Sequence, residues 1–151
     1  MAQTHTEPQV AYQEKVRPSV GAWVLVAIGA GSTALMVLPV WTLGAFVLPV
    51  ITFALLGWWM RSLTVTIIVT AQRLYVGEAH IDRAFISGAL ALDTEAARTA
   101  SGTGLDARAF LVTRPWVKTS VRIDIDDVND PTPYWLVSSR HPRELAAALQ
   151  P

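Results

Sequence analysis

The chain contains no cysteine, which excludes disulfide bonds, thiol catalysis and metal sites with cysteine ligands. It carries no net charge, and residues 61–151 hold ten basic and ten acidic side chains. A nucleic-acid-binding protein is expected to have a basic surface, so we predict no nucleic-acid partner. The three histidines, His5, His80 and His141, are too far apart in sequence to show the spacing of a metal site.

Charge itself is absent from residues 21–60, which contain no Lys, Arg, Asp, Glu or His. About 20 apolar residues in a helix cross the hydrocarbon core of a bilayer, so this run is long enough for two spans. Pro39, Thr42 and Gly44 lie at its middle and favour a tight turn there. We therefore predict a transmembrane helical hairpin over residues 20–61.

The two helices are expected at 20–39 and 43–61, and the tryptophans fall at their ends. Indole rings prefer the membrane–water interface, so we predict that these side chains anchor the hairpin at its two membrane levels. The predicted membrane-interface anchors are Trp23, Trp41, Trp58 and Trp59.

Basic residues flank the hairpin on both sides, whereas its turn has no charge. Lys15 and Arg17 precede the first helix, and Arg61 and Arg73 follow the second. The positive-inside rule then places both termini in the cytoplasm, and we predict a multi-pass protein of the inner, or cell, membrane.

Two other interpretations fit parts of the same pattern. A hairpin buried in a soluble domain would have only about 90 further residues to cover it, and would normally keep a polar face. A cleaved signal peptide would use Lys15 and Arg17 as its basic region and residues 29–31 as its cleavage site, but the apolar run continues beyond them.

No ionisable group lies within the predicted spans, so transport of ions or protons is not expected. The small residues Gly29, Gly31 and Ser32 are expected to pack within the hairpin. The alternative is that the same residues mediate homodimerisation, so a second copy of the chain is also a candidate partner.

The predicted domain organisation has three parts. A polar N-terminal cytoplasmic segment covers residues 1–19, the hairpin covers 20–61, and a cytoplasmic domain covers 62–151. Within this last part, β-branched and alternating patterns predict strands, and Ala-rich patterns predict helices. Strands are expected at 63–70, 74–81, 85–92, 107–117, 118–125 and 134–139, and helices at 93–100 and 140–149.

This order resembles a bacterial pleckstrin-homology-like domain: a small α+β fold with an antiparallel barrel or sandwich and a C-terminal helix. The whole chain also resembles an actinobacterial membrane protein family, the domain of unknown function 3093. The motifs that carry this resemblance are YQEKV, RLYVG, FLVTRPWVKTSVRIDIDD and DPTPYWLVSSRHPRELAAAL. It implies the architecture but no activity, because the family has no established substrate or catalytic residue.

The candidate interaction surface is the segment RPWVKTSVR with a nearby aromatic residue. Arg114, Lys118 and Arg122 surround Trp116, and basic residues beside an aromatic ring suit an anionic headgroup at a membrane. Tyr134 precedes Trp135 on a strand, so if Trp135 is in the core, Tyr134 is expected to be exposed to a partner.

The acidic loop DIDDVNDP does not match a calcium-binding loop. Counted from Asp124, the fifth, sixth and twelfth positions are Val128, Asn129 and Trp135, where an EF-hand needs a ligand, glycine and glutamate. The sequence also has no nucleophile elbow, phosphate loop or zinc signature. We therefore predict no metal, no cofactor and no enzymatic activity.

The predicted function is that of a non-enzymatic membrane protein that presents a cytoplasmic interaction module to a protein partner. Recognition of an anionic lipid or of the membrane surface is the alternative, and a small membrane enzyme is the third hypothesis.

Overall fold

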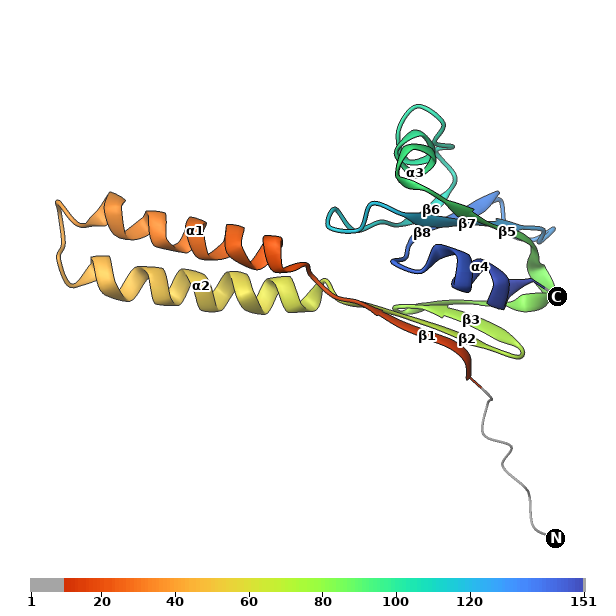
Figure 1. Cartoon of the computed structure of the whole chain (residues 1–151), viewed down its shortest axis with the longest axis horizontal. Helices are drawn as coiled ribbons and strands as arrows, with labels where there is room; N and C mark the ends of the chain where they lie inside the picture. The colour runs from red at the N-terminus through yellow and green to blue at the C-terminus, as the bar shows by residue number, and fades with distance from the viewer. Residues whose placement is uncertain (1–9, 151) are drawn as a thin grey trace, which may run out of the picture. The chain divides into compact units, whose positions relative to one another are not determined.

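The computed structural model describes residues 10–150, which divide into two compact units. Arg17–Thr64 forms one unit, and the described residues on either side of it together form the other. The first unit is a helical hairpin, and the second is an α+β domain (Figure 1).

The hairpin consists of α1 (Val20–Val37) and α2 (Gly44–Ser62), which agree with the predicted helices to within two residues. The Ser19 side chain caps α1 by accepting a hydrogen bond of 3.3 Å from the Ala22 amide. Pro49 lies inside α2. Both helices are long and apolar enough to cross a membrane.

The two helices pack through small residues, but not through those expected. Ala30, Ala45 and Gly57 are buried between the helices, where small side chains allow close approach. Gly29 and Gly31 are exposed, and a Cβ atom added at either would meet nothing within 4 Å. The predicted role of Gly29, Gly31 and Ser32 in packing within the hairpin is therefore wrong.

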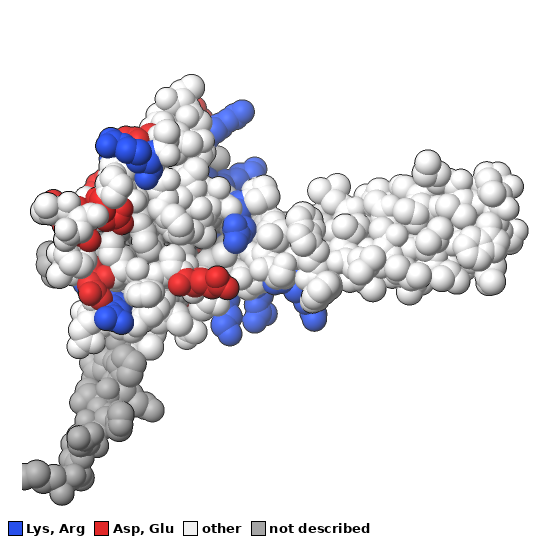
Figure 2. All heavy atoms as spheres, turned by 180° about the vertical axis from the view of Figure 1, so that it is seen from behind, with Lys and Arg blue, Asp and Glu red and all other residues white. Residues whose placement is uncertain are grey.

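The outer surface of the hairpin is apolar and free of charge. Large side chains such as Leu35 and Phe46 are 77% and 71% exposed, and the length of the hairpin appears white in Figure 2. The hydroxyls of Ser32 and Thr33 donate to the carbonyls of Ile28 and Ala30 in their own helix. Their polar groups are thus satisfied without a partner outside the helix.

The first sheet of the α+β domain has the strand order β1-β2-β3-β4. Its strands are β1 (Val10–Val16), β2 (Val65–Thr70), β3 (Arg73–Val76) and β4 (Ala79–Asp82). β1 was not predicted, because its inward side chains include a carboxylate, Glu14, where the pattern would require an apolar residue.

β1 and β2 are antiparallel neighbours, although the whole hairpin separates them in sequence. Val16, the last residue of β1, pairs with Val65, the first residue of β2. The hairpin is therefore inserted at the position of a β-turn, and β1 belongs to the domain that follows it.

A second difference from the prediction concerns residues 74–81, where one strand was expected and two strands, β3 and β4, are found. Val76 and Ala79 pair across a two-residue turn at Gly77 and Glu78. Gly77 has φ of +63°, a conformation that glycine adopts without a steric penalty. The glycine thus closes a β-hairpin.

The second sheet has the order β5-β7-β8-β6, in which only β6 and β8 are parallel. A short 3₁₀ turn (Arg83–Phe85) leads from the first sheet to the second. The two sheets remain separate in the described part of the chain, so of the expected barrel or sandwich a closed barrel is not formed. The strands are β5 (Ile86–Leu92), β6 (Phe110–Val112), β7 (Ser120–Ile125) and β8 (Tyr134–Ser138).

Two helices complete the domain, at positions close to those predicted. α3 (Thr94–Ser101) lies outside the second sheet, and α4 (Pro142–Leu149) lies between the two sheets (Figure 1). Leu145 and Leu149 of α4 are buried in a core to which both sheets contribute. The C-terminal helix therefore joins the sheets by filling the space between them.

Candidate functional site

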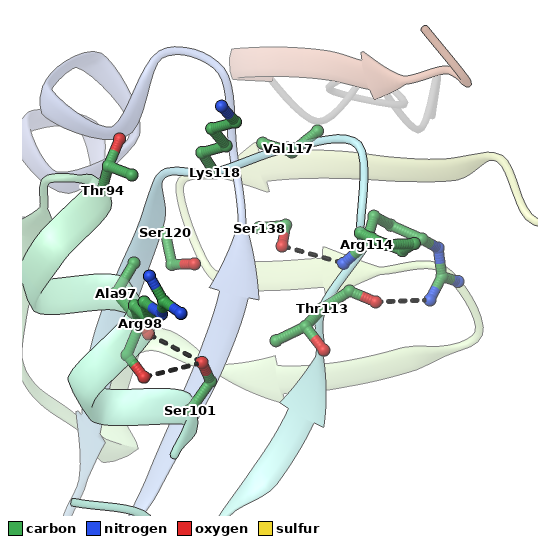
Figure 3. Close-up of a pocket in the computed structure, with 11 residues that line it drawn as sticks. Thr94, Ala97, Arg98, Ser101, Thr113, Arg114, Val117, Lys118, Ser120 and Ser138 are labelled. Carbon is green, nitrogen blue, oxygen red and sulfur yellow. Dashed lines mark hydrogen bonds between the residues drawn. The ribbon is translucent and has the colours of Figure 1, made fainter. Parts of the chain in front are cut away.

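A cavity of about 480 Å³ lies beside α3 in the α+β domain, and its walls are basic and rich in hydroxyl groups (Figure 3). Arg98 comes from α3, Arg114 and Lys118 come from the loop between β6 and β7, and Ser120 and Ser138 come from β7 and β8. We call this space the cationic cavity.

One face of α3 supplies the first wall of the cationic cavity. Thr94, Ala97, Arg98 and Ser101 recur at the spacing of one helical face and all line the space. The side chain of Asp93 caps the helix by accepting a 2.9 Å hydrogen bond from the Ala96 amide. Because Ala97 is buried against the second sheet, Arg98 is held at the edge of the cavity.

The loop between β6 and β7 supplies the opposite wall and is fixed at both ends. The Arg114 amide donates to Ser138 Oγ at 2.9 Å, and the Thr119 hydroxyl donates to the Ser139 carbonyl at 2.6 Å. These contacts hold Arg114 and Lys118 on the rim, so the structure brings together two of the predicted surface residues.

Trp116 lies between these two basic residues, but its ring is partly buried. Its Nε1 atom is buried and has no hydrogen-bond partner among the described residues. Leaving an indole N–H unpaired costs free energy, so the ring is held there by its packing. Trp116 does not line the cationic cavity.

Arg122 and Tyr134 form a separate contact outside the cavity. The Arg122 guanidinium lies 4.1 Å from the centre of the Tyr134 ring and forms a 2.8 Å ion pair with Asp124. Tyr134 is buried, and its hydroxyl accepts a hydrogen bond from the Asp106 amide.

The expected exposure of Tyr134 is therefore wrong. Trp135 does face the main core, but Tyr134 packs with Leu92, Ala97 and Leu136 on the opposite face of the sheet. The reason is that α3 covers that face, so both sides of β8 are buried. Alternation on a strand predicts opposite directions, but it cannot show whether the outer face is covered.

A second polar cluster surrounds the buried carboxylate of Glu14. Its Oε2 atom accepts from the hydroxyls of Tyr12 at 2.8 Å and Ser139 at 2.6 Å, and its Oε1 atom accepts from the Arg140 amide at 2.8 Å. Burial, reinforced by the hydrogen bond to Glu14, raises the pKa of Tyr12 well above its usual range. His141 Nδ1 lies 3.9 Å from Glu14.

This cluster serves the fold, because Glu14 and Ser139 are buried and its groups are hydrogen-bonded to one another. Ser139 is fully buried and its hydroxyl already donates to Glu14. The cluster fixes β1 to the segment that starts α4, which joins the two ends of the α+β domain.

The acidic loop caps its own turns. Asp127 accepts from the Asn129 amide and Asp130 from the Thr132 amide, each at 2.9 Å. Over residues 10–150, no group of three or more His, Asp or Glu side chains is placed to hold a metal ion.

A family model described as "Protein of unknown function (DUF3093)" matches residues 11–149. The chain belongs to this family. No curated protein and no solved structure shows a significant match to it. The match confirms the resemblance to the domain of unknown function 3093, and the family's description assigns no activity.

Nine of the eleven residues that line the cavity of this DUF3093 protein are not among the predicted site residues, and Arg98, Ser120 and Ser138 are three of them. The periodicity of α3 could have placed Arg98 on one face with Thr94. Ser120 and Ser138 are cross-strand partners in the register of β7 and β8, and that pairing has no signal in either strand alone.

Proposed function

We propose that this protein is an integral membrane protein whose hairpin holds the α+β domain at the cytoplasmic side of the membrane. The observation that carries the proposal is the uncharged apolar surface of α1 and α2, which water would solvate poorly. Trp41, Trp58 and Trp59 are exposed at the helix ends, where indole rings suit the two membrane interfaces.

Cysteine labelling tests both insertion and orientation, because the natural chain contains no thiol. Thr42 lies in the turn of the hairpin, and Val128 is fully exposed in the loop between β7 and β8. In intact cells, an impermeant maleimide is expected to label Thr42→Cys from outside and Val128→Cys only after permeabilisation. Labelling of Val128→Cys in intact cells would show that the orientation is opposite to the one proposed. Recovery of the protein in the soluble fraction would show that the hairpin is not a membrane anchor.

We further propose that the domain is a non-enzymatic interaction module that docks a protein partner. The order of two sheets followed by a C-terminal helix supports the expected relation to pleckstrin-homology-like domains. β6 forms one edge of the second sheet, and its side chains Phe110 and Leu111 are 38% and 41% exposed. An open edge with apolar side chains suits a partner that adds a strand.

Photo-crosslinking in cells tests this surface directly. A photoreactive residue at Leu111 is expected to give one discrete adduct, and Phe110→Asp should remove it. The same photoreactive residue at Glu78, exposed in the turn between β3 and β4, is the control and should give no such adduct. Equal crosslinking at both positions would exclude the β6 edge as the docking surface.

The alternative function is recognition of an anionic lipid or of the membrane surface. It is supported by the position of Arg114 and Lys118, which line one cavity. A protein partner requires an exposed surface, whereas an anionic ligand requires a basic cavity, so the two functions use different parts of the domain.

A further inference from the structure

All charged side chains that line the cationic cavity are basic. Arg98, Arg114 and Lys118 line it, and no Asp or Glu is among its lining residues. Across residues 10–150, no ion pair or hydrogen bond is made by the side chain of Arg98 or of Lys118, although the chain has equal numbers of acidic and basic residues. Two cations thus line a cavity that has no protein carboxylate among its lining residues to neutralise them.

Buried hydroxyl groups form the floor of the same cavity. Ser120 and Ser138 are 4% and 3% exposed and lie opposite each other on β7 and β8. Ser138 Oγ accepts from the Arg114 amide, which leaves its own proton free to donate. In the part of the chain that is described, the Ser120 hydroxyl has no hydrogen-bond partner, and it lies on the cavity wall beside Arg98 (Figure 3).

Cations that form no ion pair, together with buried hydroxyl donors, are groups suited to binding a phosphate. A phosphate offers several acceptor oxygens, and its charge is best neutralised by guanidinium and ammonium groups. The volume of about 480 Å³ exceeds what one phosphate requires and lies in the range of small-molecule sites. A neutral ligand would leave the cations without counter-charge.

We propose that the cationic cavity binds a phosphomonoester, with Arg98 and Lys118 holding the phosphate charge and Ser120 donating a hydrogen bond to a phosphate oxygen. The chemistry is the same whether the group belongs to a lipid headgroup or to a soluble phosphate ester. This site deepens the alternative function proposed above. The membrane topology rests on a separate labelling experiment, so failure of one leaves the other unaffected.

Titration of the full-length protein in phosphatidylcholine nanodiscs tests the site, with glycerol 3-phosphate as the probe and calorimetry as the readout. The wild-type protein is expected to bind the probe saturably at one site. Arg98→Gln with Lys118→Gln should weaken binding at least about tenfold, because both charge-assisted contacts are lost. Ser120→Ala should also weaken it at least about tenfold, the usual range for one hydrogen bond to a charged acceptor.

Lys15→Gln with Arg143→Gln is the matched control, because it removes two exposed cations that do not line the cavity. Its affinity should match the wild type, and thermal unfolding of all variants verifies that they fold. The proposal is overturned if the wild type shows no saturable binding, or if the control loses as much affinity as the cavity variants.

A second arm identifies the source of the phosphate. Nanodiscs that contain phosphatidic acid are compared with discs that contain phosphatidylglycerol, which is anionic but carries a phosphodiester. Weaker binding of the probe only in phosphatidic acid discs supports the cavity as a lipid-headgroup site. Equal binding in both kinds of disc supports it as a site for a soluble phosphomonoester.

Discussion

Glu14 stabilises the α+β domain because a buried carboxylate finds three donors there. Two hydroxyls and one backbone amide donate to it, from β1 and from the segment before α4. A buried charge without such partners would be strongly unfavourable, whereas a fully hydrogen-bonded one fixes the groups around it. The contact between Glu14 and Ser139 joins residues 125 positions apart.

Removal of this carboxylate is expected to destabilise the domain. Glu14→Ala leaves the Ser139 hydroxyl and the Arg140 amide without their acceptor, and we expect a loss of about 3 kcal/mol in the free energy of unfolding. Glu14→Gln keeps one acceptor oxygen and should cost about half as much. Denaturant unfolding of the full-length protein in mild detergent measures both, and Glu144→Ala, at an exposed position of α4, should change little.

The Tyr12 phenol makes the domain sensitive to alkaline pH. Its pKa is raised by burial and then by the bond to Glu14, so the folded state holds the phenolic proton more tightly than the unfolded chain. The contribution is fully present below the ordinary pKa of 10.0 and is lost as pH rises above that value. The denaturant concentration at the unfolding midpoint should therefore decrease when the pH is raised beyond about 10. This decrease should be smaller in Tyr12→Phe than in the control Tyr75→Phe, which keeps the Tyr12 phenol.

At the scale of elements, the packing of α1 on α2 depends on which glycines face the partner helix. A Cβ atom at Gly57 would lie 3.2 Å from the Trp23 ring, whereas one at Gly31 would meet nothing within 4 Å. The Trp23 ring also lies 6.3 Å from that of Phe53, so it fills the space beside Gly57.

Matched substitutions separate this packing from helix propensity. Gly57→Ile and Gly31→Ile change the propensity of each helix equally, but only the first forces a side chain against Trp23. We expect Gly57→Ile to be less stable than Gly31→Ile by about 2 kcal/mol in detergent. Thermal unfolding followed by the helical circular dichroism signal measures this, and equal midpoints would contradict the observed helix contact.

The elements that were predicted well carry their signals locally. Both helices of the hairpin follow from an uncharged run, and α3 and α4 follow from caps and apolar spacing. β1 was missed because Glu14 occupies a buried position, and two of the three groups that donate to it, Ser139 and Arg140, are far away in sequence.

At the scale of the whole molecule, the hairpin is an insertion between two paired strands. Val16 and Val65 close the ladder of β1 and β2, so the α+β domain is continuous in space although its chain is interrupted. The domain should therefore fold without the hairpin if β1 is kept and the gap is closed by a turn.

Replacement of residues 17–64 by Asn-Gly, a strong two-residue hairpin turn, tests this arrangement. The product is expected to be soluble without detergent and to unfold cooperatively. A fragment of residues 62–151 lacks β1 and Glu14, and it should show no cooperative transition. A fragment that unfolds cooperatively would show that β1 is dispensable for the domain.

The two apolar helices, the α+β class and most of the strands can be predicted from the sequence, because composition and periodicity act over neighbouring residues. The sequence also placed Arg114 and Lys118 together, since they are close in the chain. No local pattern predicts that Arg98, Ser120 and Ser138 line the same cavity. That outcome depends on strand register and on the docking of α3, and both are set by packing between segments far apart in sequence.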